Sequence, residues 1–314
     1  MHTTTTTVTA ADRGLSIAPW VGSSQYRAFS DDALKDEDNA AWVMRLPPAV
    51  RQQWIDRIGW IRLVDRLAEN QSIDPASGKF QTFCRGWQQL RSYGQIAAGP
   101  YESAFAAMKA CGFADETGEL SARVIAAWEA YLYAIADYNR PDLAIDSLDD
   151  YEAMLENLAG KFFQVLPFLS LRHWQGAGAF GVVDQFYNNL RDLKEDSEQG
   201  ICYFPTQVLR RFGVDREEIL HLCCFDNPGY HRMMAFWLED FLPQLTARMQ
   251  GFVAAEDLHE SWEILRYWSL HRYSRIEQVF YWCGFDFSQF PDRYWPAVRR
   301  DLQRWQVTSV TSDQ

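Results

Sequence analysis

Apolar side chains recur every three or four residues along most of this chain, and this spacing constrains the fold more than any other feature. Trp54, Ile58, Ile61 and Val64 follow it, and a second run does so over residues 124–135. The spacing places apolar side chains on one face of a helix, whereas the alternation typical of strands is nearly absent. We therefore predict an all-α protein.

The predicted helices are separated by short clusters of Gly, Pro, Asp and Asn, which are typical of turns. These clusters lie at residues 74–78, 112–118, 139–141, 176–181, 198–205 and 226–229. None is long enough for a linker, so we predict one helical domain over residues 25–305. Residues 1–24 are rich in Thr and are predicted to be a disordered tail, and residues 306–314 a C-terminal tail. Ser147, with Asp150 three residues later, predicts a helix start with a capping box.

The composition narrows the classes of partner. Aromatic residues make up 15% of the chain, which indicates either a bulky core or an apolar cavity walled by rings. The net charge of −12 argues against a nucleic-acid partner and against a basic patch for anionic lipid.

The N-terminal threonine run lacks the pattern of a secretory signal, and no apolar stretch approaches the ~20 residues of a membrane helix. With six scattered cysteines and no CxxC pair, we predict a cytoplasmic protein without a transmembrane segment.

The most informative stretch is DQFYNNLRDLKEDSEQG, which begins at Asp184. On a helix, one polar stripe would contain Gln185, Asn188, Asp192 and Asp196. Arg191 and Glu195 would form a second stripe beside it. Mg²⁺ prefers oxygen ligands, takes one or two carboxylates, and completes its shell with water and substrate phosphate. The stripe therefore predicts a magnesium site, although a solvated face with an ordinary Arg191–Glu195 surface pair is the alternative.

A second acidic pair, Asp65 and Glu69, is also four residues apart on a predicted helix. Taken alone, this pair could be the charged edge of an amphipathic helix. Two acidic helices that face each other across an aromatic cavity would instead make a site for two or three Mg²⁺ ions and a diphosphate. The presence of both pairs in one all-helical chain favours this second interpretation.

The run from Gln185 to Asp196 resembles the second aspartate-rich motif of squalene and phytoene synthases, and all six motif positions match. Leu46-Pro47 with Arg51, and then Asp65 and Glu69, is similar to the first motif of the family, with DxxxE in place of DxxxD. Between the motifs, the matching stretch contains Asp137, Leu148, Tyr151 and Ala159-Gly160. The resemblance extends over residues 39–213. Three further positions depart from the family pattern: Arg66 replaces a common Asp, Ile201 replaces an Arg that often follows the glycine, and Trp262 lies near where a Tyr is usual.

This resemblance implies a single-domain, isoprenoid synthase-type helical bundle around a central cavity. It implies a prenyl transferase that condenses two farnesyl or geranylgeranyl diphosphates head to head, through a cyclopropyl diphosphate, to a linear terpene of the squalene or phytoene type. Carotenoid biosynthesis is one such role. The cofactor would be Mg²⁺, with Mn²⁺ as a substitute, and NADPH would be needed only for squalene. Because the product would be apolar, the resemblance also allows peripheral contact of the protein with a membrane during product release.

The resemblance also implies roles for individual residues. The metal ligands would be Asp65, Glu69, Asn188, Asp192 and Asp196. Arg51 and Arg191 would bind phosphate oxygens. The substrate site would be completed by Gln185 and Asp137. Tyr151 would supply a hydroxyl to it.

Two other functions remain compatible with these residues. A cyclising terpene synthase would use one diphosphate on the same fold. A non-catalytic helical lipid-binding or assembly protein would keep the fold without turnover.

Overall fold

A computed structural model describes residues 42–43, 46–138 and 143–310 of the chain. The predicted tail over residues 1–24, the predicted domain start at Gln25 and the predicted break at 139–141 lie outside these residues. In the described residues every regular element is a helix, which confirms the all-α prediction. None of these helices is long and apolar enough to cross a membrane.

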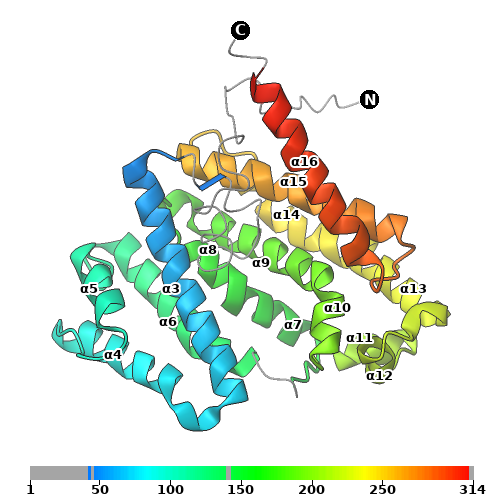
Figure 1. Cartoon of the computed structure of the whole chain (residues 1–314), viewed down its shortest axis with the longest axis horizontal. Helices are drawn as coiled ribbons and strands as arrows, with labels where there is room; N and C mark the ends of the chain where they lie inside the picture. Colours follow the sequence, from blue (N-terminus) through cyan, green and yellow to red (C-terminus); the bar gives the residue numbers. More distant parts are fainter. Residues whose placement is uncertain (1–41, 44–45, 139–142, 311–314) are drawn as a thin grey trace.

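The first part of the chain forms helices that start on the left of Figure 1 and continue to its centre. The elements are α3 (Pro48–Ile73), the short 3₁₀ turn η2 (Pro75–Ser77), α4 (Lys79–Tyr93), α5 (Glu102–Ala110), α6 (Glu119–Tyr138), α7 (Leu148–Leu155), the π-helical segment η3 (Glu156–Gly160) and α8 (Lys161–Val165). Helix α3 packs on α4 and α6, and α6 continues the contact to α8.

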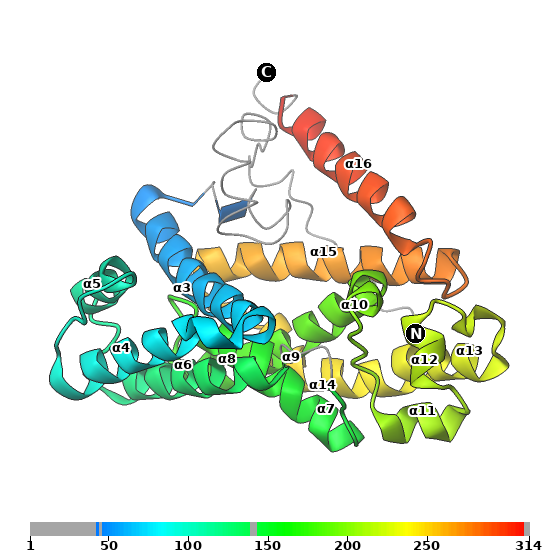
Figure 2. The same ribbon diagram turned by 60° about the horizontal axis from the view of Figure 1, so that its bottom comes forward.

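The remaining elements begin at the centre of the molecule, extend to its right side and return to the top, where the last helix ends (Figure 1). They are η4 (Leu171–His173), α9 (Trp174–Arg191), α10 (Leu193–Glu198), α11 (Thr206–Phe212), α12 (Arg216–Leu220), η5 (Cys224–Asp226), α13 (Pro228–Ala235), the π-helical segment η6 (Phe236–Phe241), α14 (Leu242–Val253), α15 (Glu260–Trp282) and α16 (Phe290–Val310). Helix α16 continues past residue 305, where the predicted domain ends. Figure 2 shows α15 running across the molecule, with α9 on one side and α16 on the other.

Helices α3 and α7 form for the reasons that their sequences indicate. Trp54, Ile58 and Val64 are all buried on one side of α3, whose first residue is a proline. At the start of α7, the Ser147 hydroxyl accepts from the Asp150 backbone N–H, and the Asp150 carboxylate accepts from the Ser147 N–H. This is the predicted capping box.

Helix α9 is the central helix, and its observed start corrects one prediction. Residues 176–181 are rich in glycine and were expected to form a break, but they lie inside α9. An added Cβ at Gly176 would lie 2.7 Å from Phe252, and one at Gly181 would lie 2.3 Å from the Ala159 carbonyl oxygen. These glycines are therefore needed for the close approach of α9 to α14 and η3, and packing outweighs their low helix propensity.

Aromatic contacts join an early part of the described chain to a late helix. Trp42 meets Trp54 of α3 with ring centroids 4.9 Å apart, and Trp54 meets Trp262 of α15 at 5.4 Å, both edge to face. The Trp262 indole N–H donates to the Pro167 carbonyl at 2.7 Å. The Trp54–Trp262 contact thus connects α3 with α15.

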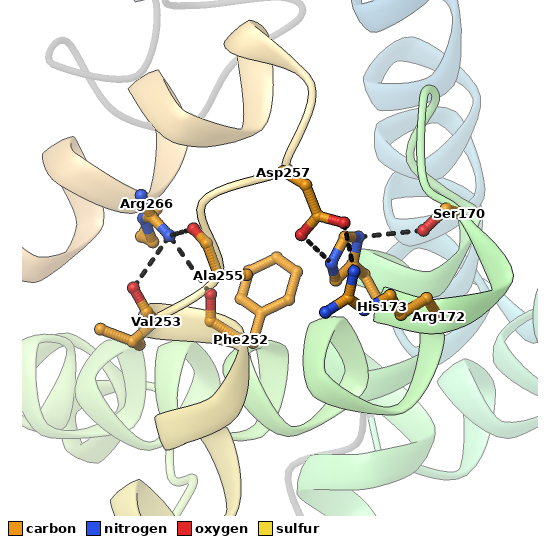
Figure 3. Close-up of polar contacts among 8 residues, drawn as sticks. All are labelled: Ser170, Arg172, His173, Phe252, Val253, Ala255, Asp257 and Arg266. Atoms are coloured by element: carbon orange, nitrogen blue, oxygen red, sulfur yellow. Dashed lines mark hydrogen bonds and ion pairs between the residues drawn. The ribbon is translucent and has the colours of Figure 1, made fainter.

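Two polar groups hold the region where α14 ends and α15 begins, as Figure 3 shows. The Arg266 guanidinium of α15 donates to the carbonyls of Phe252, Val253 and Ala255 at the end of α14. These carbonyls lie at or just after the end of α14, where a helix leaves its last carbonyls without their usual i+4 N–H donors, so the arginine acts as a C-cap.

The second group in Figure 3 is a histidine at the start of α9. One ring nitrogen of His173 lies 2.9 Å from the Ser170 hydroxyl, and the other lies 3.0 Å from the Asp257 carboxylate. Arg172 pairs with the same carboxylate at 2.6 Å. Asp257 belongs to the connection between α14 and α15, so the histidine ties this connection to the N-terminal end of α9.

Candidate active site

A cavity of about 700 Å³ lies between α3, α6, α9, α10 and α15. Its apolar wall consists of Trp42, Trp54, Ile58, Ile61, Ile73, Ile135, Leu158, Ala159, Phe162, Phe163, Leu166, Ile201 and Leu265. Its polar wall consists of Arg62, Asp65, Glu69, Tyr131, Asp184, Gln185, Asn188, Asn189, Asp192, Glu195, Asp196, Gln199, Tyr203 and Arg272. A cavity of this size suits a small organic ligand that has an apolar body and a charged end.

The first acidic pair reaches the cavity from α3. Asp65 and Glu69 are one turn apart, and both line the wall, as predicted from their spacing. The Asp65 carboxylate accepts from the Arg62 guanidinium at 2.5 Å, and both side chains are largely buried. Arg62 also lines the cavity. Sequence reasoning missed this arginine, although its position three residues before Asp65 was a visible signal.

The second acidic pair reaches the same cavity from the junction of α9 and α10. Helix α9 ends at Arg191, and Asp192 is the residue between the two helices. The Asp196 N–H donates to the Asp192 carbonyl at 2.8 Å, so the backbone continues as a turn. Both carboxylates therefore line the cavity despite the break in the helix, and Glu195 lines it as well.

Arg191 lies behind this pair instead of on the wall. Its guanidinium donates to both oxygens of Asp192, each at 2.7 Å, and only 3% of its side chain is exposed. The expected alternative was a surface pair with Glu195. The buried Arg191 instead fixes the orientation of Asp192, because a planar guanidinium matches a carboxylate with two parallel hydrogen bonds.

Two tyrosines of the cavity wall lie near the carboxylates of the acidic pairs. Burial raises the pKa of Tyr203 far above its usual value, and the carboxylates of Asp196, Asp65 and Asp192 raise it further. Burial also raises the pKa of Tyr131, with a further contribution from Asp65. Tyr203 therefore lies near carboxylates of both acidic pairs. The hydroxyls of Tyr203 and Tyr131 keep their protons at neutral pH and can donate hydrogen bonds.

The amides between the acidic pairs form an ordered chain. Gln185 donates to the Asn189 oxygen at 2.8 Å, and Asn189 donates to the Tyr151 hydroxyl at 3.2 Å. Tyr151 is buried, does not line the cavity, and is hydrogen-bonded to Asn189, which does. Asn188 donates to Asp184 at 3.1 Å, while its own side-chain oxygen is buried with no hydrogen-bond partner among the described residues.

Four of the predicted residues do not line the cavity. Arg191 and Tyr151 are buried, as described above. Arg51 is half-buried near the start of α3, and Asp137 is exposed near the end of α6. The structure brings together Asp65, Glu69, Gln185, Asn188, Asp192 and Asp196.

The residues of the wall fit a hard divalent cation, but only together with a ligand. In the part of the chain that the structure describes, no three His, Cys, Asp or Glu side chains gather closely enough to hold a metal ion alone. The donors present are carboxylate oxygens and the unpaired Asn188 oxygen, which are the types that Mg²⁺ binds. A diphosphate would have to supply further oxygens.

Comparison with known proteins identifies the family. The family model for squalene/phytoene synthase matches residues 33–242, about two thirds of the chain. The chain belongs to the squalene/phytoene synthase family. At the level of the family, it is a transferase of isoprenoid biosynthesis. Both acidic pairs and the cavity-lining part of α9 fall within the matched residues.

A solved structure supports the fold across a larger share of the chain. The crystal structure of a dehydrosqualene synthase in complex with ligand superimposes with a TM-score of 0.62. The match covers 88% of this chain and 98% of that one, with 14% sequence identity. At this identity the likeness establishes the isoprenoid synthase-type helical fold. A search of curated protein sequences gives no significant match.

Proposed function

We propose that this protein is a Mg²⁺-dependent prenyl transferase that condenses two isoprenyl diphosphates head to head. The substrates would be farnesyl or geranylgeranyl diphosphate. The product would be a linear terpene of the squalene or phytoene type, formed through a cyclopropyl diphosphate. One observation carries the proposal: acidic pairs from α3 and from the α9–α10 junction line one cavity whose remaining wall is largely apolar and aromatic.

The acidic end of the cavity supports binding of the diphosphate groups. Asp65, Glu69, Asp192, Asp196 and Asn188 would hold Mg²⁺, which when bound supplies the positive charge that stabilises a departing diphosphate. Arg62 lines the same end and can donate to phosphate oxygens. The protonated hydroxyls of Tyr131 and Tyr203 offer further donors to an anionic ligand.

The apolar end supports the chemistry of the isoprenyl chains. When one diphosphate departs with the electron pair of its C–O bond, an allylic cation remains. The double bond of the second substrate captures this cation, and loss of a proton closes the cyclopropane ring. Trp54, Phe162 and Phe163 line this end, where they would exclude water and present ring faces to a cation.

The test is product analysis with defined substrates. Incubation of the full chain with Mg²⁺ and farnesyl or geranylgeranyl diphosphate should give a hydrocarbon with twice the carbon number of the substrate. Adding NADPH would distinguish a squalene-type ending from a phytoene-type one. A cyclic product from a single substrate would instead identify a cyclising terpene synthase, and no diphosphate release from either substrate would reject the enzymatic proposal.

A pair of variants on α10 tests the role of the acidic end. Asp196→Asn should lower kcat/KM by about 10²–10³-fold, the usual effect of losing one group that stabilises charge in a transition state. Asp196 is preferable to Asp192 because replacing Asp192 would also leave the buried Arg191 without its carboxylate. Glu198→Gln is the matched control, since Glu198 is exposed on the same helix and away from the cavity wall. Equal activity of both variants would contradict the proposed metal site.

A further inference from the structure

The wall of the cavity also contains Asp184, a carboxylate that belongs to neither acidic pair. Asp184 lies on α9 directly after Val182 and Val183, and only 5% of it is exposed. Burying an ionised carboxylate is costly unless its oxygens accept hydrogen bonds from well-placed donors. Asp184 therefore needs well-placed hydrogen-bond donors around it.

Helix α15 supplies two donors to one oxygen of this carboxylate. The Arg272 guanidinium and the Tyr273 hydroxyl both donate to Asp184 Oδ1, the latter at 2.7 Å. Arg272 is 3% exposed and lines the cavity beside Asp184. Burial raises the pKa of Tyr273 well above its usual value, and the Asp184 charge raises it further, so the hydroxyl keeps its proton and donates.

The other oxygen faces an amide one turn further along α9. Asp184 Oδ2 accepts from Asn188 Nδ2 at 3.1 Å. An ionised carboxylate can only accept, so the amide must turn its NH₂ group toward Asp184 and its oxygen away. That oxygen is the buried Asn188 Oδ1 that has no partner among the described residues.

We propose that Asp184 is a positioning residue that fixes the amide of Asn188 so that its oxygen faces the metal–diphosphate end of the cavity. Arg272 and Tyr273 hold Asp184 in the orientation that this requires. The inference rests on the proposed function, because it assigns the Asn188 oxygen to the same diphosphate site. Stability alone gives little reason for this network, since a buried ion pair can often be replaced by apolar residues without loss.

The experiment measures metal binding and does not depend on turnover. Binding of Mn²⁺ to the full chain, in the presence of inorganic diphosphate, is followed through the loss of the electron paramagnetic resonance signal of free Mn²⁺. The single change Asp184→Asn would leave Arg272 buried without its counter-charge. The double variant Asp184→Leu/Arg272→Met removes both charges together and is the safer choice for folding.

The double variant should bind Mn²⁺ about 10–100-fold more weakly, the usual effect of removing a group that orients a metal ligand. Asn188→Ala should cause a similar loss. Combining all three changes should weaken binding no further than Asn188→Ala alone, because Asp184 acts through that amide. Asp301→Leu/Arg275→Met is the matched control. It removes another pair that contains a buried arginine of α15, at 3.1 Å, away from the cavity wall, and should leave Mn²⁺ affinity unchanged.

The outcomes separate this inference from the proposed function. If the unaltered chain binds no Mn²⁺ with diphosphate, the proposed metal site is wrong and the inference is overturned with it. If the unaltered chain binds Mn²⁺ but Asp184→Leu/Arg272→Met binds it equally well, the inference alone is overturned. Losses that add fully in the triple variant would also overturn it, since Asp184 would then act independently of Asn188.

Discussion

Gly181 is the residue at which the packing of α9 can be tested most directly. It is buried in the middle of the helix, and a Cβ added there would lie 2.3 Å from the Ala159 carbonyl oxygen and 2.8 Å from its carbon. Both atoms belong to the backbone of η3, so no side-chain rotation can relieve the overlap. Non-bonded carbon atoms normally lie about 3.5 Å or more apart, so α9 and η3 would have to separate by about 1 Å.

The expected destabilisation of Gly181→Ala follows from two opposing terms. Replacing glycine by alanine inside a helix stabilises by about 1 kcal/mol. Overpacking a well-filled core costs about 1–3 kcal/mol, and a backbone obstacle places this site at the upper end. The free energy of unfolding should therefore fall by about 2 kcal/mol.

Gly59 provides the matched control for this substitution. It lies inside α3, and a Cβ added there would meet nothing within 4 Å. Gly59→Ala should keep the helix-propensity term alone and raise the free energy of unfolding by about 1 kcal/mol. Urea unfolding followed by far-UV circular dichroism would measure both variants. A Gly181→Ala protein as stable as the unaltered chain would refute the close approach of α9 to η3.

Two further predictions concern buried groups elsewhere. Cys111 and Cys223 are exposed and should react with a thiol reagent at pH 8, whereas burial raises the pKa of Cys202 to about 11 and should keep it unlabelled until the pH approaches that value. Peptide mass spectrometry would distinguish the three cysteines, and equal labelling would contradict the burial of Cys202. Trp262→Phe removes the donor to the Pro167 carbonyl and should cost about 1–3 kcal/mol in urea unfolding, whereas an unchanged midpoint would mean that this hydrogen bond contributes nothing.

Local sequence patterns predicted the helices where local forces decide the structure. The burial of Trp54, Ile58 and Val64 follows from their spacing, and the start of α7 follows from the Ser147 capping box. The same reasoning failed at residues 176–181, because glycine is a sign both of a turn and of a close helix crossing. Only the contact with a distant segment, η3 or α14, decides between the two.

The acidic pairs of the site were predictable for the same reason, since carboxylates four residues apart share a helix face. The hydrogen-bond partners of these carboxylates were less predictable. Arg191 was expected to bind phosphate oxygens, with a surface pair to Glu195 as the alternative, but its buried side chain pairs with Asp192. Arg272 is 88 residues from Asp184, and no local pattern connects them. Contacts of this kind depend on tertiary packing, which a single sequence does not specify.

The two arginines beside the acidic pairs have different physical roles. Several carboxylates around one cavity repel one another, so a neighbouring guanidinium on each side lowers the cost of assembling the site before any cation arrives. Arg191 holds Asp192 through two hydrogen bonds and is almost fully buried, and it does not line the cavity. Arg62 contacts Asp65 through a single nitrogen, is 22% exposed, and lines the wall. A diphosphate in this cavity can therefore reach Arg62 directly, whereas Arg191 acts on the ligand only through the orientation of Asp192.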